Sequence, residues 1–399
     1  MKVLIATHQW FPDYTGGTAR VATETARRLA DRGHSVHVVA PENGTGPSEG
    51  QEGSLLLSRV LPRGRVPQTI SDTAQSWRYC RRVDSRSIDI VIAHHPTLAG
   101  GMLAARLDAP LVFVYHSSVI RELRLFHGAL GGGSLRRQAT SLVEPALELL
   151  ERVTVARAAR TLVLSEYSRT LVTGDHPARS EAVRRVSGGV DTDDFAPSTD
   201  RATTRSQLGV SNERPLIVVA RRLGPSLGLE SVLEAFARVH ASPAPTLTVV
   251  GDGPLRRPLE ALAERLGVAA SVRFIGFPPP ERLRAWYQAA DLFVMSPAPH
   301  EGFGLATLEA LASGTPVVGG PRGATPEILR PLDQRLVAHG SDAEALAAAM
   351  SEVLALADAD LRRRCRDYAV DHYDWNVAGS AWEQALTEAL ACGSLSRKR

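Results

Sequence analysis

Short apolar runs alternate with amphipathic stretches throughout the first half of the chain. A helical pattern begins at Thr18 or Ala19, ends at Asp31 and lies between two apolar runs, so it predicts a strand–helix–strand opening. Continuous apolar runs of this length are typical of strands buried in a parallel sheet. The predicted strands of this half are Lys2–Ala6, Ser35–Val39, Ser87–Ala93, Pro110–Tyr115 and Thr161–Leu164. A helix N-cap signal at Ser165 follows the last of them.

Two stretches of this half are less regular. Residues 41–60 are rich in Gly, Ser and Glu, which predicts a mobile surface loop. Residues 117–160 begin as a glycine-interrupted loop and continue as an amphipathic helix. Its predicted apolar side carries Leu142, Leu147, Leu149, Leu150 and Val153. Several arginines in this region are compatible with a membrane-surface helix, but glutamates offset much of their charge and favour a solvated face.

The second half repeats the alternation and predicts a second parallel sheet with helices on both faces. Residues 197–213, rich in Ser, Thr, Asp and Arg, are expected to link the two halves. Helical patterns at Leu361–His372 and Trp375–Leu390 are followed by a polar tail at 391–399. The predicted strands are Arg214–Ala220, Thr246–Val250, Ser271–Ile275, Asp291–Met295 and Pro316–Gly319.

Composition favours a two-domain protein in a reducing compartment. The chain has 399 residues with 44% hydrophobic content, enough for two cores of ordinary size. A net charge of +3 gives no indication of nucleic-acid binding, while a pI near 8.9 tolerates anionic ligands. Cys80, Cys365 and Cys392 are scattered and odd in number, which argues against a disulfide framework or a zinc site. The N-terminus lacks a long apolar segment, so we expect a cytoplasmic protein without an integral membrane segment.

One stretch, Pro297–Ala324 (PAPHEGFGLATLEALASGTPVVGGPRGA), combines two carboxylates with a predicted helix start. Glu301 lies in a Pro- and Gly-rich loop, and the helix predicted from Gly304 to Leu311 carries Glu309. A helix start flanked by glycines offers unpaired N–H groups to a phosphate. The eight positions between the acids are about 12 Å of helix rise. A diphosphate there would have a sugar near Glu301 and a ribose near Glu309, although a lone E-x7-E pair is more often two solvated acids.

The pattern H-E-G-F-G-L-x3-E-A-L-A-x-G-T-P-V-V resembles the donor-binding signature of family-4 retaining glycosyltransferases of the GT-B fold. The resemblance covers nearly the whole chain and is strongest from Arg214 to Leu329. It implies an α/β protein of two Rossmann-like α/β/α domains that face each other across a cleft. The implied parts are an acceptor-binding domain at 1–196, a linker at 197–213, a donor-binding domain at 214–372, a helix at 373–390 crossing back to the N-terminal domain, and the tail at 391–399.

The resemblance also implies roles for residues at the ends of predicted strands. Arg222 falls on the Arg of an R-L-x-x-x-K-G loop that neutralises the diphosphate, but Leu227 occupies the Lys position. One cation is therefore missing, and Arg221 and Arg322 are candidates to replace it. The implied catalytic residues are His116, Arg222 and Glu301. The implied donor-binding residues are Gly16, Gly17, Arg222, Gly251, Gly253, Gly276, Phe277, Glu301, Gly302, Phe303, Gly304, Leu305 and Glu309.

Two motifs resemble metal ligands but favour other interpretations. Asp191-Thr192-Asp193 has the D-x-D form that binds divalent ions in the other major glycosyltransferase fold, yet its neighbours predict a turn. His94-His95 lacks a third ligand and is expected to consist of helix-entry or core residues. We therefore expect neither a metal nor a cofactor.

These observations predict a retaining glycosyltransferase that moves a sugar from a nucleoside diphosphate sugar to a small-molecule, glycan or lipid-linked acceptor. The sugar, the acceptor and the choice among UDP, GDP and ADP stay open, because backbone contacts to a base leave little side-chain trace. One alternative is a non-catalytic nucleotide-sugar-binding pseudo-enzyme, for which Leu227 is the main argument. The other is a sugar-nucleotide epimerase or a phosphorylase on the same fold.

Overall fold

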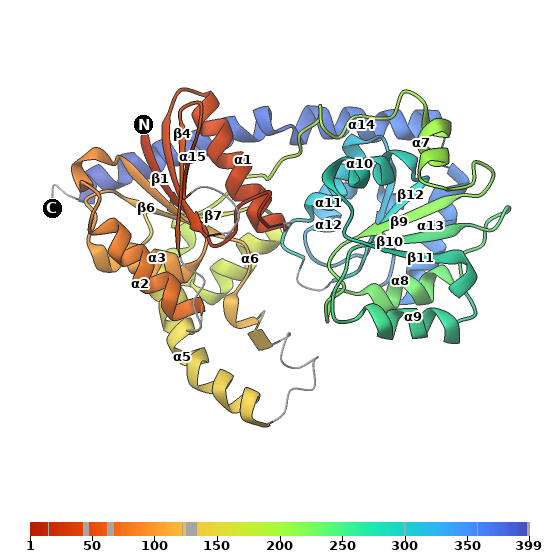
Figure 1. The fold of residues 1–399 in the computed structure, drawn as a ribbon, viewed down its shortest axis with the longest axis horizontal. Helices are drawn as coiled ribbons and strands as arrows, with labels where there is room; N and C mark the ends of the chain where they lie inside the picture. Colours follow the sequence, from red (N-terminus) through yellow and green to blue (C-terminus); the bar gives the residue numbers. More distant parts are fainter. Residues whose placement is uncertain are drawn as a thin grey trace. The chain divides into compact units, whose positions relative to one another are not determined.

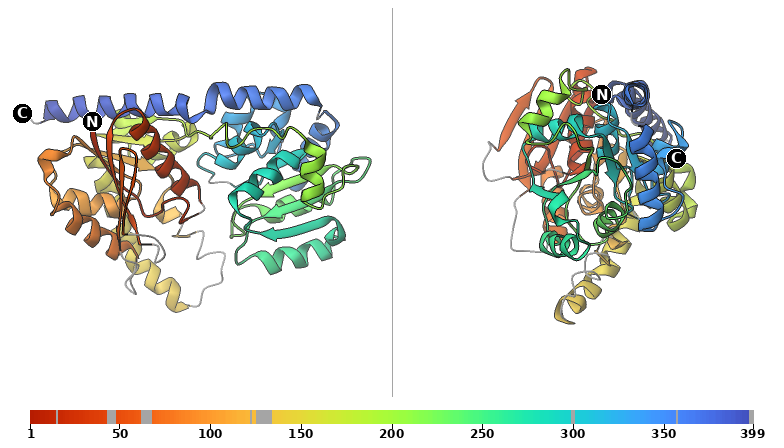
Figure 2. Two further views of the ribbon diagram at one scale, coloured as in Figure 1. Left: turned by 45° about the horizontal axis from the view of Figure 1, so that its top comes forward. Right: turned by 90° about the vertical axis from the view of Figure 1, so that its right-hand side faces the viewer.

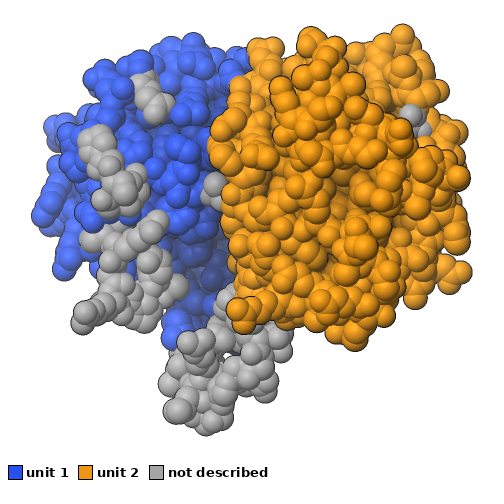
Figure 3. All heavy atoms as spheres, turned by 45° about the vertical axis from the view of Figure 1, so that its right-hand side comes forward, with its two compact units in different colours: residues 1–188, 375–399 blue, residues 189–374 orange. Residues whose placement is uncertain are grey.

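The computed structural model describes residues 1–14, 16–42, 48–61, 68–121, 123–124, 134–298, 301–356 and 358–396. The chain divides into two compact units, which Figure 3 distinguishes by colour. Unit 1 comprises Met1–Gly188 and Trp375–Arg399, and unit 2 comprises Gly189–Asp374. The division thus comes at 188/189 and 374/375, whereas the sequence interpretation placed a linker at 197–213. Each unit is an α/β structure built on one sheet (Figure 1).

Unit 1 contains an eight-stranded sheet in the order β3-β4-β2-β1-β5-β6-β7-β8. Every neighbouring pair is parallel except β3 and β4. The strands are β1 (Lys2–Ala6), β2 (Ser35–Pro41), β3 (Glu49–Glu52), β4 (Leu55–Leu61), β5 (Ile90–Ala93), β6 (Leu111–Tyr115), β7 (Arg160–Val163) and β8 (Val183–Arg185). From β1 the chain first adds strands towards β4 and then reverses, adding β5 to β8 on the other side of β1.

The prediction of a loop over residues 41–60 is wrong for the described part of that range. β4 pairs parallel with β2, and β3 pairs antiparallel with β4. Leu55 and Leu57 are buried while Leu56 is exposed, which is the alternation of a half-buried strand. Apart from Glu42, which follows β2, the glycines and glutamates that favoured a loop lie in β3, in the turn before β4 and at 43–47, which is outside the described residues.

The helices of unit 1 cover both faces of the sheet. α1 and α15 pack together, whereas α3 packs against both α2 and α5. These helices are α1 (Gly17–Asp31), α2 (Gln68–Cys80), α3 (Pro96–Ala105), α5 (Ser134–Arg157), α6 (Glu166–Asp175) and α15 (Trp375–Ser396). α15 continues through residues that the sequence assigned to a polar tail. The predicted apolar side of α5 is also partly wrong, because Leu147 is buried while Leu149 and Val153 are exposed; positions two apart do not share a helix face.

Unit 2 confirms the predicted second parallel sheet, in the order β11-β10-β9-β12-β13 (Figure 1, Figure 2). Its strands are β9 (Leu216–Ala220), β10 (Thr246–Val250), β11 (Val272–Gly276), β12 (Leu292–Met295) and β13 (Val317–Gly319). α8 (Leu229–Phe236) packs with α9 (Arg256–Arg265) and α13 (Ala343–Leu356). α11 (Leu305–Ala312) packs with α10 (Pro280–Ala289) and α14 (Ala359–Tyr373), and α12 (Thr325–Leu329) adjoins β13.

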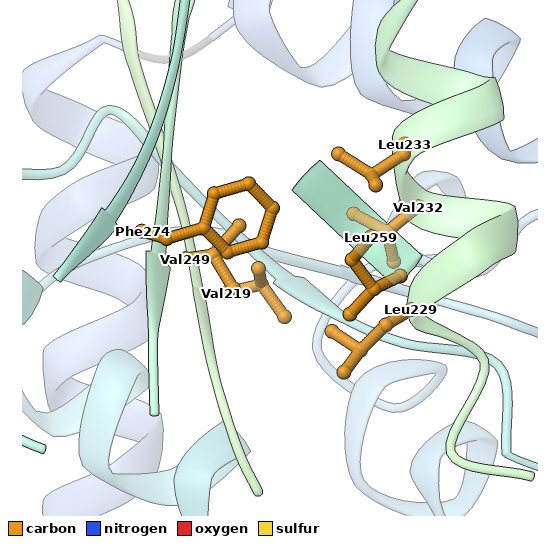
Figure 4. A pocket seen from close by; sticks show the side chains of 7 residues that line it. All are labelled: Val219, Leu229, Val232, Leu233, Val249, Leu259 and Phe274. Carbon is orange, nitrogen blue, oxygen red and sulfur yellow. The ribbon is translucent and has the colours of Figure 1, made fainter. Parts of the chain in front are cut away.

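Apolar side chains fill the space between this sheet and helices α8 and α9 (Figure 4). Val219, Val249 and Phe274 come from the strands, and four further residues come from the helices: Leu229, Val232, Leu233 and Leu259. None of the seven carries a polar side-chain group, so this gap belongs to the hydrophobic core and offers nothing to a sugar or a phosphate.

The predicted linker 197–213 contains a helix, α7 (Arg201–Gln207), that belongs to unit 2. Asp200 caps it by accepting from the backbone N–H of Thr203. Arg201 and Arg205 both pair with Asp291, which also accepts from the backbone N–H of Leu216 at the start of β9, 2.7 Å away. The segment is therefore fixed to the sheet.

Arginines of α14 occupy the carboxyl ends of two other helices. Arg362 donates to the carbonyl of Ala290, just after α10, at 2.9 Å. Nη1 of Arg366 donates to the carbonyl of Ala312, the last residue of α11, at 2.9 Å, and also to Thr192 and Phe195. These contacts satisfy carbonyls that a helix end leaves unpaired. Among the described residues, every helix is too short or too polar to cross a membrane.

We predict that Asp291→Ala lowers the free energy of unfolding of unit 2 by about 3 kcal/mol, because it leaves the buried guanidinium of Arg205 without its acid partner. Urea unfolding measures the change. Asp194→Ala is a matched control, since Asp194 is the exposed partner of Arg284, and its effect is expected to stay below about 0.5 kcal/mol. Equal effects of the two substitutions would contradict the prediction.

Candidate active site

Both sheets have a position at which the strand order reverses, between β9 and β12 in unit 2 and between β1 and β5 in unit 1. In open parallel α/β sheets, ligands bind beyond the carboxyl ends of the strands at such a reversal. The residues that follow β9 and β12, and those that follow β1 and β5, are therefore the first candidates for a functional site.

In unit 2, the reversal brings Arg221, directly after β9, into contact with residues that follow β12. Its Nη2 lies 3.1 Å from Oε2 of Glu301, and its Nη1 lies 2.6 Å from the Ser296 hydroxyl. That hydroxyl donates to the backbone carbonyl of Leu227 at 2.7 Å. Both side chains of the Arg221–Glu301 ion pair are largely buried, with 15% and 17% exposed. The sequence had named Arg221 only as a substitute cation, whereas it is the partner of Glu301.

Glycines let the loops that follow β9, β10 and β11 approach one another closely. A Cβ on Gly251 would lie 2.0 Å from the carbonyl oxygen of Arg221, and one on Gly253 would lie 2.4 Å from that of Leu223. Gly251 has a φ of 131°, which also disfavours other residues. Gly276 accepts from the backbone N–H of Gly251 at 2.8 Å, and Phe277 after it is exposed. These predicted donor-binding residues thus form one backbone platform beside Arg221.

α11 begins next to Glu301, as the sequence predicted. Gly304 is its N-cap in a left-handed conformation (φ 86°) without a side-chain cap, so the first N–H groups of the helix, from Leu305 onward, receive no side-chain acceptor there. Gly302 lies in the same loop, and Phe303 is buried, with its ring 6.4 Å from that of Tyr373. The predicted ribose ligand Glu309 accepts a hydrogen bond of 2.8 Å from the Tyr287 hydroxyl.

The loop from Arg222 to Gly228 places a cation and an apolar side chain together. A Cβ on Gly224 would lie 3.3 Å from Leu227 and 3.6 Å from Nε of Arg222, so both side chains flank this glycine. Arg222 is exposed and forms no ion pair with any described residue. Arg322, the other predicted substitute, is also exposed. Within the part of the chain that the structure describes, Arg221 is the substitute that contacts Glu301.

In unit 1, the predicted glycine pair Gly16-Gly17 starts α1. Gly16 is the N-cap in an extended conformation that any residue adopts, so its backbone does not require glycine. Arg20 in the first turn places its guanidinium 3.8 Å from the centroid of the Phe11 ring.

Four histidines follow strands at or next to the reversal in unit 1. His8 follows β1, His94 and His95 follow β5, and His116 follows β6. Nδ1 of His94 lies 3.0 Å from Nε2 of His116, and the rings of His8 and His95 are 4.5 Å apart between centroids. Burial lowers the pKa of His8 to about 4 and that of His116 to about 3, and it holds the pKa of His94 and His95 well below the usual value. All four are therefore neutral at physiological pH.

The two motifs that resembled metal ligands have the expected local roles. Asp191 accepts from the backbone N–H groups of Asp193 and Asp194 at 3.2 and 3.0 Å, which is the predicted turn. His95 is the N-cap of α3 and accepts from the backbone N–H of Thr97, while His94 is buried. The helix-entry and core interpretation of this pair is confirmed.

Ser296, Tyr287 and His8 lie at the candidate sites but were not predicted from the sequence. Ser296 comes directly after β12 and His8 two residues after β1, so position relative to a strand end is the signal that would have found them. Tyr287 lies inside α10 and is 1% exposed, and nothing in the local sequence distinguishes it from an ordinary core aromatic.

Comparison with known proteins gives the class. The chain matches the model of glycosyl transferases group 1 over residues 200–372 and that of glycosyltransferase family 4 over residues 15–194. It belongs to the family-4 glycosyltransferases and has the GT-B fold. D-inositol 3-phosphate glycosyltransferase of Corynebacterium jeikeium (strain K411) is 30% identical over 367 residues, which are 87% of this chain and 81% of that protein.

The chain also resembles one further sequence relative and one solved structure, whose names give activities different from that of the C. jeikeium protein. The GDP-mannose-dependent alpha-(1-6)-phosphatidylinositol monomannoside mannosyltransferase of Mycolicibacterium smegmatis (strain ATCC 700084 / mc(2)155) is 34% identical over 222 residues, 52% of this chain. The chain matches 57% of that protein's length. The structure of sucrose-phosphate synthase from Thermosynechococcus elongatus superimposes with a TM-score of 0.80 and 20% identity, covering 98% of this chain and 99% of that one.

We predict that the four neutral histidines make unit 1 less stable as the pH falls. Between the unfolded pKa of about 6.5 and their lower folded values, the unfolded chain binds more protons, so each histidine lowers the free energy of unfolding by up to about 1.4 kcal/mol per pH unit. Urea unfolding at about pH 7.5 and about pH 5 measures the loss, and His8→Gln removes part of it. His240→Gln, at an exposed position, is the control expected to leave the pH dependence unchanged.

Proposed function

We propose that this protein transfers a sugar from a nucleoside diphosphate sugar to an acceptor hydroxyl with retention at the anomeric carbon. The observation that carries the proposal is the Arg221–Glu301 pair at the strand reversal of unit 2, beside the uncapped start of α11. In this proposal the Glu301 carboxylate binds sugar hydroxyls, and the neighbouring guanidinium and backbone N–H groups bind the diphosphate. The chain's family membership supports the same assignment.

Each part of the donor is assigned to a described element. Glu301 accepts from hydroxyls of the sugar, while the first N–H groups of α11 and the exposed Arg222 bind the diphosphate. Glu309, oriented by Tyr287, accepts from the ribose hydroxyls. The base lies along the backbone of Gly276 and Phe277, where β11 ends. The same platform of close-packed glycines keeps side chains away from the phosphates.

The proposed reaction breaks the bond between the anomeric carbon and the diphosphate oxygen and forms a bond to the acceptor oxygen on the same face. The acceptor hydroxyl proton passes to the departing diphosphate oxygen, so no protein nucleophile is required. Negative charge grows on the diphosphate as it leaves, and donors aimed at that charge contribute about 3–4 kcal/mol each. We propose that arginines and backbone N–H groups meet this charge without a metal.

The missing lysine is the main objection to an active enzyme, and Arg221 answers it. Its Nη1 contacts both the hydroxyl and the backbone carbonyl of Ser296, whereas Nη2 contacts Glu301 alone among the described residues, so Nη2 has a second N–H for a phosphate or sugar oxygen. The Ser296 hydroxyl connects this guanidinium with the backbone of Leu227 through contacts of 2.6 and 2.7 Å. The guanidinium is therefore linked to the backbone of residue 227, whose side chain lies beside Gly224 and Arg222.

The names of two relatives support a proposal about the substrates. Their names specify GDP-mannose as donor in one case and D-inositol 3-phosphate in another. We propose a GDP-sugar as the first candidate donor and a polyol or polyol-containing lipid as acceptor. The free thiols of Cys80, Cys365 and Cys392 fit a reducing compartment such as the cytoplasm.

Donor binding and transfer are tested first, with EDTA present because the proposal needs no metal. A thermal-shift panel of UDP-, GDP- and ADP-sugars is expected to raise the melting temperature with one base, since a ligand that binds only the folded state stabilises it. Glu301→Ala and Arg222→Ala are each expected to lower kcat about 100- to 1000-fold while the protein stays folded.

Glu264→Ala and Arg265→Ala are the matched controls, because both positions are exposed on α9. Near-normal turnover in either site variant would contradict the assigned role. Donor binding without transfer to any hydroxyl acceptor would favour the nucleotide-sugar-binding pseudo-enzyme, for which Leu227 remains the specific observation.

The role of Arg221 predicts a rescue. Arg221→Met is expected to lower kcat about 100-fold, and adding Leu227→Lys is expected to restore most of it, because either cation reaches the leaving group. Leu227→Lys alone is expected to change kcat less than about 3-fold. The same lysine in an Arg222→Met background serves as the control and is expected to give little recovery. A large gain from Leu227→Lys alone would show that Arg221 does not replace the missing cation.

A further inference from the structure

Two histidines at the strand reversal of unit 1 contact each other through one ring nitrogen each. Nδ1 of His94 lies 3.0 Å from Nε2 of His116, and the rings are stacked with centroids 5.3 Å apart. His94 is 2% exposed, and it follows β5 directly, as His116 follows β6. Because β5 and β6 are neighbours in the sheet, the backbone fixes this pairing.

A neutral imidazole has one N–H donor and one bare acceptor nitrogen, so this contact has two possible arrangements. If His116 donates from Nε2, His94 must carry its own proton on Nε2. If His94 donates from Nδ1, its Nε2 is a bare acceptor and His116 carries its proton on Nδ1. The two arrangements therefore present opposite groups at Nδ1 of His116: a lone pair in the first and an N–H in the second.

The surroundings of His94 favour the second arrangement. Its Nε2 is buried and has no hydrogen-bond partner within the described part of the chain. A buried N–H without an acceptor is rarer in proteins than an under-satisfied acceptor, so the first arrangement carries the larger penalty. The neighbouring His95 has no influence on this choice, because its Nδ1 accepts from Thr97 and its proton must lie on Nε2.

We propose that His94 is a positioning residue that donates from Nδ1 to His116 and so makes His116 present Nδ1–H to an oxygen of the substrate. With its Nε2 lone pair engaged, His116 acts as a neutral hydrogen-bond donor and not as the base that deprotonates the acceptor. The identity of that oxygen rests on the proposed function, whereas the protonation pattern of the two rings does not.

Neutrality of the pair has independent support. Burial lowers the pKa of His116 to about 3 and that of His94 well below its usual value. The His8 imidazole lowers the pKa of both rings, and the His116 imidazole also lowers that of His94. The acceptor proton must then go elsewhere, and the departing diphosphate oxygen is the group that gains basicity as its bond to the sugar breaks. The donor role of His116 and the same-face reaction are thus mutually consistent.

Long-range 1H–15N spectra of the full-length protein labelled with 15N-histidine distinguish the two ring patterns directly. His116→Gln identifies the signals of His116. The expected result is protonation of His116 at Nδ1 and of His94 at Nδ1, without titration of either ring between about pH 5 and pH 8. Protonation of His116 at Nε2 in the unsubstituted protein would overturn the proposal. This measurement needs neither donor nor acceptor, so it remains decisive if the protein transfers no sugar.

Substitutions at His94 separate positioning from packing. In His94→Asn, the side-chain amide donates from nearly the same place as Nδ1, so His116 is expected to keep its proton on Nδ1 and kcat/KM to change less than about 3-fold. His94→Phe keeps the ring but removes the donor, so the proton of His116 is expected to move to Nε2 and kcat/KM to fall about 10-fold or more. If His116 keeps its Nδ1 proton in a folded His94→Phe protein, His94 does not set it and the proposal fails.

Discussion

The reversal of strand order in each parallel sheet is the constraint on which the candidate site depends. A strand pair whose following connections run in opposite directions leaves space at its carboxyl ends, because the two helices that follow cover opposite faces. In unit 2 that pair is β9 and β12, and the space receives Arg221, Ser296 and Glu301. In unit 1 it is β1 and β5, which are followed by His8, His94 and His95, while His116 follows the neighbouring strand β6. Each cluster joins segments that are far apart in sequence, so both result from the topology.

This explains which parts of the molecule the sequence predicted. Buried parallel strands are continuous apolar runs, so strands such as Lys2–Ala6 and Thr246–Val250 were predicted with their observed bounds. The start of α11 was predictable because Gly302 and Gly304 mark it and Glu301 precedes it. The hairpin of β3 and β4 was not, since its polar face and its turn have the composition of a loop. α7 was hidden for a similar reason: its stability comes from ion pairs with Asp291, which is 86 to 90 positions away.

The pairwise contacts of the site were beyond sequence reasoning for a different reason. His94 with His116, Arg221 with Glu301 and Tyr287 with Glu309 each join residues from separate elements. Which strands are neighbours has to be known before such pairs can be proposed. The roles that the family resemblance implies for Glu301, Arg222 and His116 stay predictions. The described contacts show which protein groups surround these side chains, and they do not test which substrate groups the side chains bind.

The arginines of α14 have a consequence for how the donor site varies. Arg366 holds the carboxyl end of α11 through Ala312, while the amino end of the same helix faces the proposed diphosphate. Because α11 has only eight residues, loss of the Arg366 contact at its carboxyl end also weakens the support of the backbone N–H groups at its amino end. If α11 binds the diphosphate as proposed, a substitution at Arg366 would act on the donor site without changing any residue that contacts the nucleotide.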